Sequence, residues 1–211
     1  MTGEVQVDNR PSPAAADSLL NLNRGAPLRS LSLALNFVNS ALPSSVLRSA
    51  LPFSQREFRD ALGQFATGVT IITARSAEGH PVGTTVSSFN ALSLSPALVL
   101  WSLNLHANSL PVFRHCTHYA IHVLAASQKP LAELFARKGA DRFSHTPHHN
   151  SEHGVPLLEG CAAVFECRHR NLHEEGDHLL FVAEVQRCEH HVDRAPLLYH
   201  AGHMHTHGFQ K

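Results

Sequence analysis

Apolar and polar residues alternate along six stretches of the chain, which is the pattern of half-buried β-strands. Each stretch is rich in β-branched or aromatic residues and is bounded by segments of polar residues, Gly or Pro. The predicted strands span 69–74, 82–89, 97–103, 119–124, 162–169 and 179–188.

Three short segments have helical rather than strand periodicity. In the first, Ser54 and Glu57 have the spacing of a capping box, and Gly68 is expected to end the helix. The other two predicted helices lie at 109–114 and 127–138. The apolar positions that recur on one face of the first helix are Phe58, Leu62 and Phe65.

The order of these elements decides between two fold classes. A doubly wound parallel sheet needs strands and helices in alternation, and the strands here outnumber the helices. The pattern therefore predicts a mainly β protein, an antiparallel barrel with a few peripheral helices.

The region 1–52 differs from the rest of the chain and is predicted to be an N-terminal arm outside the barrel. Residues 1–27 have little periodicity and many Pro, Ala, Asn and Asp residues, which is typical of flexible segments. No cationic segment precedes an apolar one, so the pattern of a targeting peptide is missing. One amphipathic helix is expected near 30–42, where apolar residues recur at Leu31, Leu35, Val38 and Leu42.

Composition excludes several classes of partner. The chain has 17 basic and 17 acidic residues, and this zero net charge is unlike that of nucleic-acid-binding proteins. No apolar run approaches the roughly 18 residues of a membrane span. The four cysteines form no C-x-x-C pair and are too few for a disulfide scaffold, so we expect a cytoplasmic protein.

Histidine is unusually frequent, with 18 residues. Side chains two residues apart in an extended chain project to the same side, so the C-terminal histidines could chelate a divalent ion. No carboxylate lies among them to support such ligands, and we interpret them as a solvated tail, assigning no metal site. The two clusters are His145, His148, His149 and His153, and His200, His203, His205 and His207.

A run of small hydroxyl residues is the best candidate for a binding site. The segment 83–89 reads GTTVSSF, and a leading glycine with Ser and Thr lets a flat ligand lie close to the main chain. The alternative is a half-buried strand with a solvated Ser/Thr face. Glycine-rich nucleotide motifs, G-x-G-x-x-G or the P-loop, are missing from the sequence.

Several motifs occur together and in order: FRDALGQFATGVTIIT at 58–73, VGTTVSSF at 82–89, SPALVL at 95–100, DRF at 141–143, GDHLLFV at 176–182 and PLLYHAG at 196–202. In this order they resemble the flavin reductase-like domain family, whose members have an FMN-binding split β-barrel. The resemblance implies one such domain at 53–207.

The resemblance also implies roles for particular residues. Main-chain groups from Thr84 to Ser88 would contact the flavin ring. The region from Ser102 to Ser109, and Arg142, would approach the phosphate end of the flavin. No residue is assigned a catalytic role. The implied flavin-binding residues are Thr84, Thr85, Val86, Ser87, Ser88, Ser102, Asn104, Ser109 and Arg142, and the implied nicotinamide-binding residues are Gly176, Asp177 and His178.

By the same resemblance the protein is an NAD(P)H:flavin oxidoreductase. It would bind FMN or FAD and NADH or NADPH, form a homodimer, and supply reduced flavin to a separate monooxygenase component. Two alternatives stay open: a flavin-bound reductase of another acceptor, such as a corrinoid or ferric chelate, and a non-catalytic flavin- or metal-binding protein.

Overall fold

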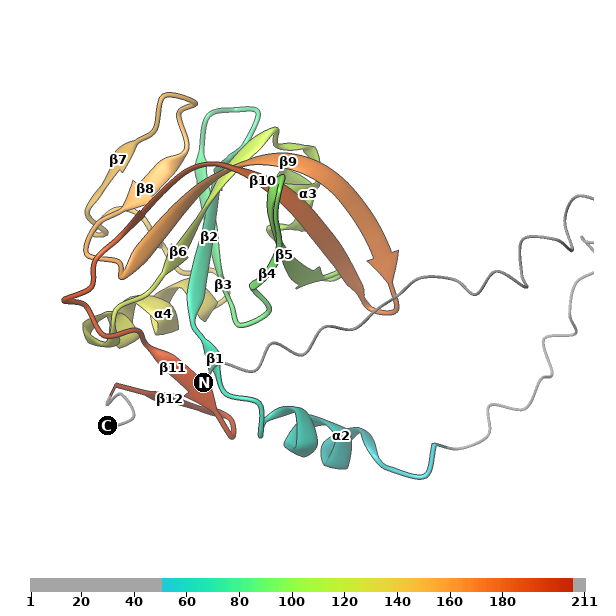
Figure 1. The fold of residues 1–211 in the computed structure, drawn as a ribbon. Helices are drawn as coiled ribbons and strands as arrows, with labels where there is room; N and C mark the ends of the chain where they lie inside the picture. The colour runs from blue at the N-terminus through green and yellow to red at the C-terminus, as the bar shows by residue number, and fades with distance from the viewer. Residues whose placement is uncertain (1–50, 207–211) are drawn as a thin grey trace, which may run out of the picture. The chain divides into compact units, whose positions relative to one another are not determined.

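Seven antiparallel strands form the main sheet of the protein, whose computed structural model describes residues 51–206 (Figure 1). Every neighbouring pair in this sheet is antiparallel, as expected from the sequence. In spatial order the strands are β3 (Pro81–Val86), β2 (Thr70–Arg75), β6 (His118–Val123), β9 (Ala163–Glu175), β10 (His178–His190), β5 (Ala97–Asn104) and β4 (Asn90–Leu94).

The sheet curves until the segment after its edge strand β3 meets β5, which is next to the opposite edge strand. The Ser88 hydroxyl, just after β3, donates to the carbonyl of Ser102 at 2.8 Å and accepts from the Ser102 N–H at 2.9 Å. β9 and β10 form a long curved hairpin (Figure 1), and its pairing register shifts twice. Such bulges increase the local bend of a strand, which favours closure of a barrel.

Smaller elements surround this barrel. β1 (Thr67–Gly68), β11 (Leu198–His200) and β12 (His203–His205) form a three-stranded sheet, and β7 (His148–Asn150) pairs with β8 (Pro156–Leu158). The helices are α2 (Gln55–Leu62), α3 (Leu110–His115), the 3-10 turn η2 (Ala126–Gln128) and α4 (Lys129–Ala136).

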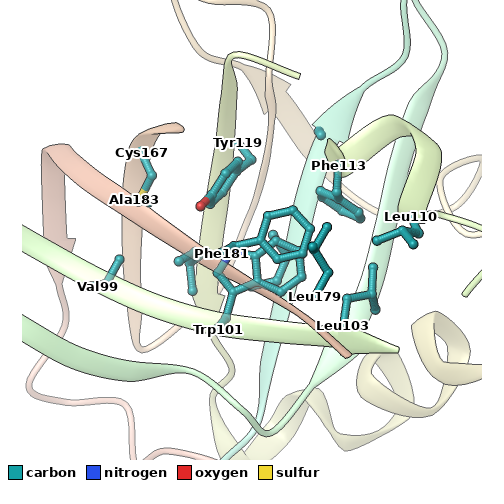
Figure 2. Close-up of a cluster of buried hydrophobic side chains, with 13 residues drawn as sticks. Val99, Trp101, Leu103, Leu110, Phe113, Tyr119, Cys167, Leu179, Phe181 and Ala183 are labelled. Atoms are coloured by element: carbon teal, nitrogen blue, oxygen red, sulfur yellow. The ribbon is translucent and has the colours of Figure 1, made fainter. Parts of the chain in front are cut away.

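The barrel core is centred on Trp101, which is fully buried. Its ring stacks on Phe181 with centroids 4.1 Å apart and meets the rings of Phe113 and Tyr119 edge-on (Figure 2). Burial alternates along β5, so Trp101 points into the core while Ser102 lies on the opposite face. This alternation places the candidate site directly behind the core.

The first predicted helix begins where expected but ends early. Ser54 and Glu57 form the predicted capping box, with the Ser54 hydroxyl accepting from the Glu57 N–H at 3.2 Å. The helix ends at Leu62, so the expected end at Gly68 is wrong. The carbonyl of Gly63 accepts from the Ala201 N–H at 2.8 Å, and the chain then enters β1.

The predicted strands are present, but two differ in extent: β3 ends at Val86 rather than at 89, and β9 extends to Glu175 rather than to 169. Six further short strands were not predicted. The outer half of β9 is mostly exposed, and this explains why its sequence lacks the alternation of a half-buried strand. The helix expected at 30–42 lies outside the described residues. Within 51–206, no helix is long and apolar enough to cross a membrane.

Candidate functional site

A cavity of about 720 Å³ lies where elements distant in the sequence meet. Its walls come from α2 and β1, from the segment after β3, from β5, and from the turn between β11 and β12. This volume is within the range of pockets that bind cofactors. The lining includes Arg59, Leu62, Phe65, Thr67, Ser87, Ser88, Ser102, Tyr199 and Gly202.

Three of the predicted flavin-binding residues line this cavity: Ser87, Ser88 and Ser102. The Ser88 hydroxyl is already occupied by its two hydrogen bonds to the main chain of Ser102. Ser88 therefore fixes one cavity wall against β5, while Ser87 is exposed to solvent. The sequence run of small hydroxyl residues thus has both a structural part and a part open to a ligand.

Thr84, Thr85 and Val86 lie in β3 and are not among the residues that line the cavity. The Thr85 hydroxyl donates to the carbonyl of Ala132 in α4 at 2.8 Å. The side chain of Val86 packs against the barrel core, and its carbonyl accepts from the Thr70 hydroxyl at 3.0 Å. The role of these three residues at the flavin ring stays a prediction.

Thr67 is a cavity residue that sequence analysis did not single out. Its hydroxyl is buried and has no hydrogen-bond partner among the described residues. Buried hydroxyls are nearly always paired, so this one, at the wall of a cavity, is a candidate donor to a bound ligand. An O–H donor beside serines and main-chain groups fits the mixed donors and acceptors of a flavin ring.

The only earlier sign of Thr67 was its place in the motif at 58–73, where it had no assigned role. Tyr199 is part of the motif at 196–202 and likewise had no assigned role. It lies opposite Thr67 in the pairing of β1 with β11. Their convergence depends on this long-range pairing, which local sequence patterns do not reveal.

The predicted nicotinamide-binding residues form the tight turn between β9 and β10. Gly176 has φ of 60°, a left-handed conformation that glycine adopts without strain. The carbonyl of Asp177 accepts from the Leu105 N–H at 2.9 Å, which ties the turn to the end of β5. His178 Nδ1 lies 2.6 Å from Asp177 Oδ1, and this hydrogen bond lowers the pKa of the Asp177 carboxyl.

Strand register connects this turn to the cavity. His178 lies opposite Asn104, and Leu180 lies opposite Ser102, in the pairing of β10 with β5. Paired residues share one face of a sheet, so His178, Asn104 and Ser102 belong to the same face. Two residues along a strand span about 7 Å, which places the turn near the Ser102 wall of the cavity.

Arg142 and Ser109 are not among the cavity-lining residues. The guanidinium of Arg142 donates to the carbonyl of Gly83 at 3.0 Å and to that of Arg137 at 2.7 Å. Burial lowers the pKa of Arg142. Ser109 is the N-cap residue of α3, and its side chain makes no capping hydrogen bond.

The histidine clusters and the thiols are the other candidates for a functional centre. Within 51–206, no group of three His, Cys, Asp or Glu side chains is placed to hold a metal ion. His207 lies outside the described residues. Burial raises the pKa of the Cys161 thiol to about 11 and of the Cys167 thiol to about 12, so both are protonated at neutral pH.

Comparison with protein families adds an independent finding. Residues 62–208 match the model of the flavin reductase like domain. A relative from Agrobacterium fabrum named FMN reductase (NADH) SmoA is 45% identical over 71% of this chain and 84% of its own length. The reductase component of a flavin-dependent trigonelline monooxygenase from Acinetobacter baylyi is 39% identical over 62% of this chain, but the match covers only 42% of that longer protein.

Solved structures agree with these sequence matches. The NADH:FAD oxidoreductase SgcE6 of Streptomyces globisporus, in complex with NAD and FAD fragments, superposes with a TM-score of 0.69 at 33% identity, over 72% of this chain and 92% of its own. The flavin reductase of the Pseudomonas putida styrene monooxygenase gives a TM-score of 0.67 at 30% identity, over 74% and 99%.

Proposed function

Because the chain belongs to the flavin reductase-like domain family, we propose that it oxidises NADH or NADPH and reduces FMN or FAD. It is an oxidoreductase with the split-barrel fold expected from its sequence. The protein then supplies the reduced flavin to a separate monooxygenase component, since several relatives are named as reductase components of monooxygenases. The observation that carries the proposal is the cavity of about 720 Å³ with its unpaired Thr67 hydroxyl.

The residues present suit orientation of two cofactors rather than acid–base chemistry. When bound, the flavin supplies the hydride-accepting atom, as cofactors generally carry such chemistry. Ser87, Ser102 and Thr67 offer hydrogen bonds to the ring, and Leu62 and Phe65 offer apolar contact. Asp60 is the only carboxylate among the described lining residues, so no acid–base pair lines the cavity.

His178 is assigned to the nicotinamide side of this site. If its Nδ1–H donates to Asp177, its Nε2 is left as an acceptor. An acceptor at the end of β10 suits an amide N–H such as that of the nicotinamide carboxamide. Asp177 then fixes the orientation of the imidazole.

The assay that tests this function is anaerobic oxidation of NADH or NADPH with FMN, FAD or riboflavin as acceptor. We expect nicotinamide oxidation to require added or bound flavin and to yield reduced flavin in equal amount. A protein that binds no flavin by fluorescence quenching, and oxidises neither nicotinamide with any of the three acceptors, would refute the proposal.

We assign a homodimer to the same protein, because its exposed apolar side chains need a partner. No residue of α2 is buried, yet the helix and its flanks carry exposed apolar residues. The edge strand β4 adds Leu94, which is 97% exposed. Large exposed apolar areas on a soluble fold mark interfaces, and most homo-oligomers are twofold dimers. The exposed residues at α2 are Phe53, Phe58, Leu62 and Phe65.

The dimer is tested with Phe58, which does not line the cavity. Burying a phenylalanine stabilises an interface by roughly 1.5–3 kcal/mol, so Phe58→Glu should weaken dimerisation by about tenfold or more. Arg56→Gln, on the same helix, is the control. A parent protein that is monomeric at micromolar concentration by light scattering would contradict the assignment.

A further inference from the structure

The cavity has one free positive charge among its described lining residues, on Arg59 of α2. Asp60 also lines the cavity, but its carboxylate lies 3.8 Å from Arg56 Nε, in an exposed ion pair. Within 51–206, Arg59 has no such ion-pair partner. Among the residues that the structure describes, no carboxylate pairs with the Arg59 guanidinium at the cavity.

The other candidate cation, Arg142, is held by main-chain groups through two of its three guanidinium nitrogens, and only its buried Nε has no partner among the described residues. Two nitrogens of the Arg142 guanidinium donate to the carbonyls of Gly83 and Arg137, so this side chain ties the segment after α4 to β3. Arg142 is also not among the residues that line the cavity. A phosphate group that binds this guanidinium through two parallel N–H donors would have to displace at least one of these main-chain hydrogen bonds.

The ligand of the proposed function needs such a cation. The side chain of FMN ends in a phosphate ester, which carries a charge of about −1.5 to −2 at neutral pH, and FAD carries a diphosphate at the same position. Arginine binds phosphate oxygens through parallel N–H donors, more strongly than neutral groups do. When the flavin ring lies at Ser87, Ser102 and Thr67, α2 is the described part of the cavity wall that offers a positive charge to the phosphate.

From these contacts we infer that Arg59, rather than Arg142, binds the phosphate next to the ribityl chain of FMN or FAD. Arg59 is thus a specificity-determining residue that favours flavin nucleotides over riboflavin. The inference rests on the proposed function, since it takes the flavin to be the occupant of the cavity.

The test compares three ligands that share one ring: riboflavin, FMN and FAD. Dissociation constants are measured by flavin fluorescence quenching for the parent and for Arg59→Gln. We expect Arg59→Gln to weaken FMN and FAD binding by about tenfold or more, the effect of losing a hydrogen bond to a charged group. Riboflavin affinity should change less than about twofold, because riboflavin has no phosphate for Arg59 to contact.

Matched variants complete the design. Lys138→Gln removes an exposed positive charge outside the cavity and should leave all three affinities unchanged. Arg59→Lys keeps the charge and should restore part of the FMN affinity. Added salt should reduce the preference of the parent for FMN over riboflavin, and this preference should be absent in Arg59→Gln.

Several outcomes would overturn the inference. One is equal loss of riboflavin and FMN affinity in Arg59→Gln, and another is a phosphate-selective loss in Arg142→Lys instead. A raised KM for NADH with unchanged FMN affinity would move Arg59 to the nicotinamide nucleotide. Failure of the proposed function is distinct, because the parent would then bind none of the three flavins.

Discussion

The two faces of strand β5 differ in how completely the protein packs the apolar side chains beside them, although polar atoms without a partner among the described residues occur near both faces. On the inner face, Trp101 is enclosed by Phe113, Tyr119 and Phe181, and every ring has aromatic neighbours. On the outer face, Ser102 borders a cavity whose wall includes Phe65, which is 72% exposed. The inner face serves folding, and the outer face retains unmet contacts that ligands and a second subunit can supply.

The largest effect is expected from the inner face. Trp101→Ala should lower the free energy of unfolding by about 3–5 kcal/mol, because truncation of a buried tryptophan leaves a cavity. Denaturant unfolding at fixed protein concentration measures this. Val192→Ala, at a position that is 93% exposed, should change stability by less than about 0.5 kcal/mol. Similar losses for both variants would contradict the proposed role of the core.

A second prediction concerns His122, a buried imidazole that ties three strands together. Its Nδ1 lies 3.0 Å from the carbonyl of Ile71, and its Nε2 accepts from the Leu158 N–H at 3.0 Å. Burial lowers the pKa of His122 to about 4. The imidazole is therefore neutral in the folded protein, with its proton on Nδ1.

The pH dependence follows from this shift. Unfolded His122 takes up a proton below about pH 6.5, whereas folded His122 does so only near pH 4. Its contribution to stability is complete above pH 6.5, and about 3 kcal/mol is lost as the pH falls to 4. Nuclear magnetic resonance titration of the His122 ring checks the cause directly. A ring that titrates near pH 6.5 in the folded protein would refute it.

The sequence predicts the strands that pack on the core better than the short strands around the cavity. The strands that pack one side on the core, such as β5 and β6, carry a clear apolar alternation. β1, β11 and β12 are two or three residues long and have no such pattern. Their pairing arises from long-range contacts, so neither their existence nor the meeting of Thr67 with Tyr199 could be predicted.

The candidate site was predictable where composition carries information. The hydroxyl run and the turn at Gly176 are local signals, and Ser87, Ser88 and Ser102 do line the cavity. Charge is different, because a sequence gives the number of arginines but not their hydrogen bonds. Only the structure separates Arg142, bound to main-chain carbonyls, from Arg59 at the cavity.

On the outer face, the strongest effect on activity is expected at His178. His178→Ala should reduce kcat/KM for NADH by about tenfold to over a hundredfold, the effect of a lost contact of about 1.5–3 kcal/mol. Flavin affinity and chemical reduction of bound flavin by dithionite should be unchanged, because neither uses the nicotinamide side. A folded, flavin-replete variant as fast as the parent would remove His178 from the site.

The smallest effect comes from comparing a buried threonine that has a hydrogen-bond partner with one at the cavity wall. The buried hydroxyl of Thr73 donates to the carbonyl of Pro156 at 2.6 Å, whereas that of Thr67 has no partner among the described residues. Valine has nearly the shape of threonine, so Thr→Val replaces the hydroxyl by a methyl group and removes its hydrogen bonds. Thr73→Val should lower the free energy of unfolding by about 1–3 kcal/mol and leave flavin affinity unchanged, because it leaves a buried carbonyl unpaired.

Thr67→Val should instead weaken flavin binding and leave the free energy of unfolding nearly unchanged. The free protein loses no hydrogen bond, so its unfolding free energy should stay the same or rise slightly. The flavin loses one hydrogen bond of about 0.5–1.5 kcal/mol, which weakens binding by about two- to tenfold. Denaturant unfolding without flavin and fluorescence quenching with FMN measure the two quantities on both variants. A Thr67→Val protein that is less stable but binds FMN normally would show that this hydroxyl serves the fold and not the ligand.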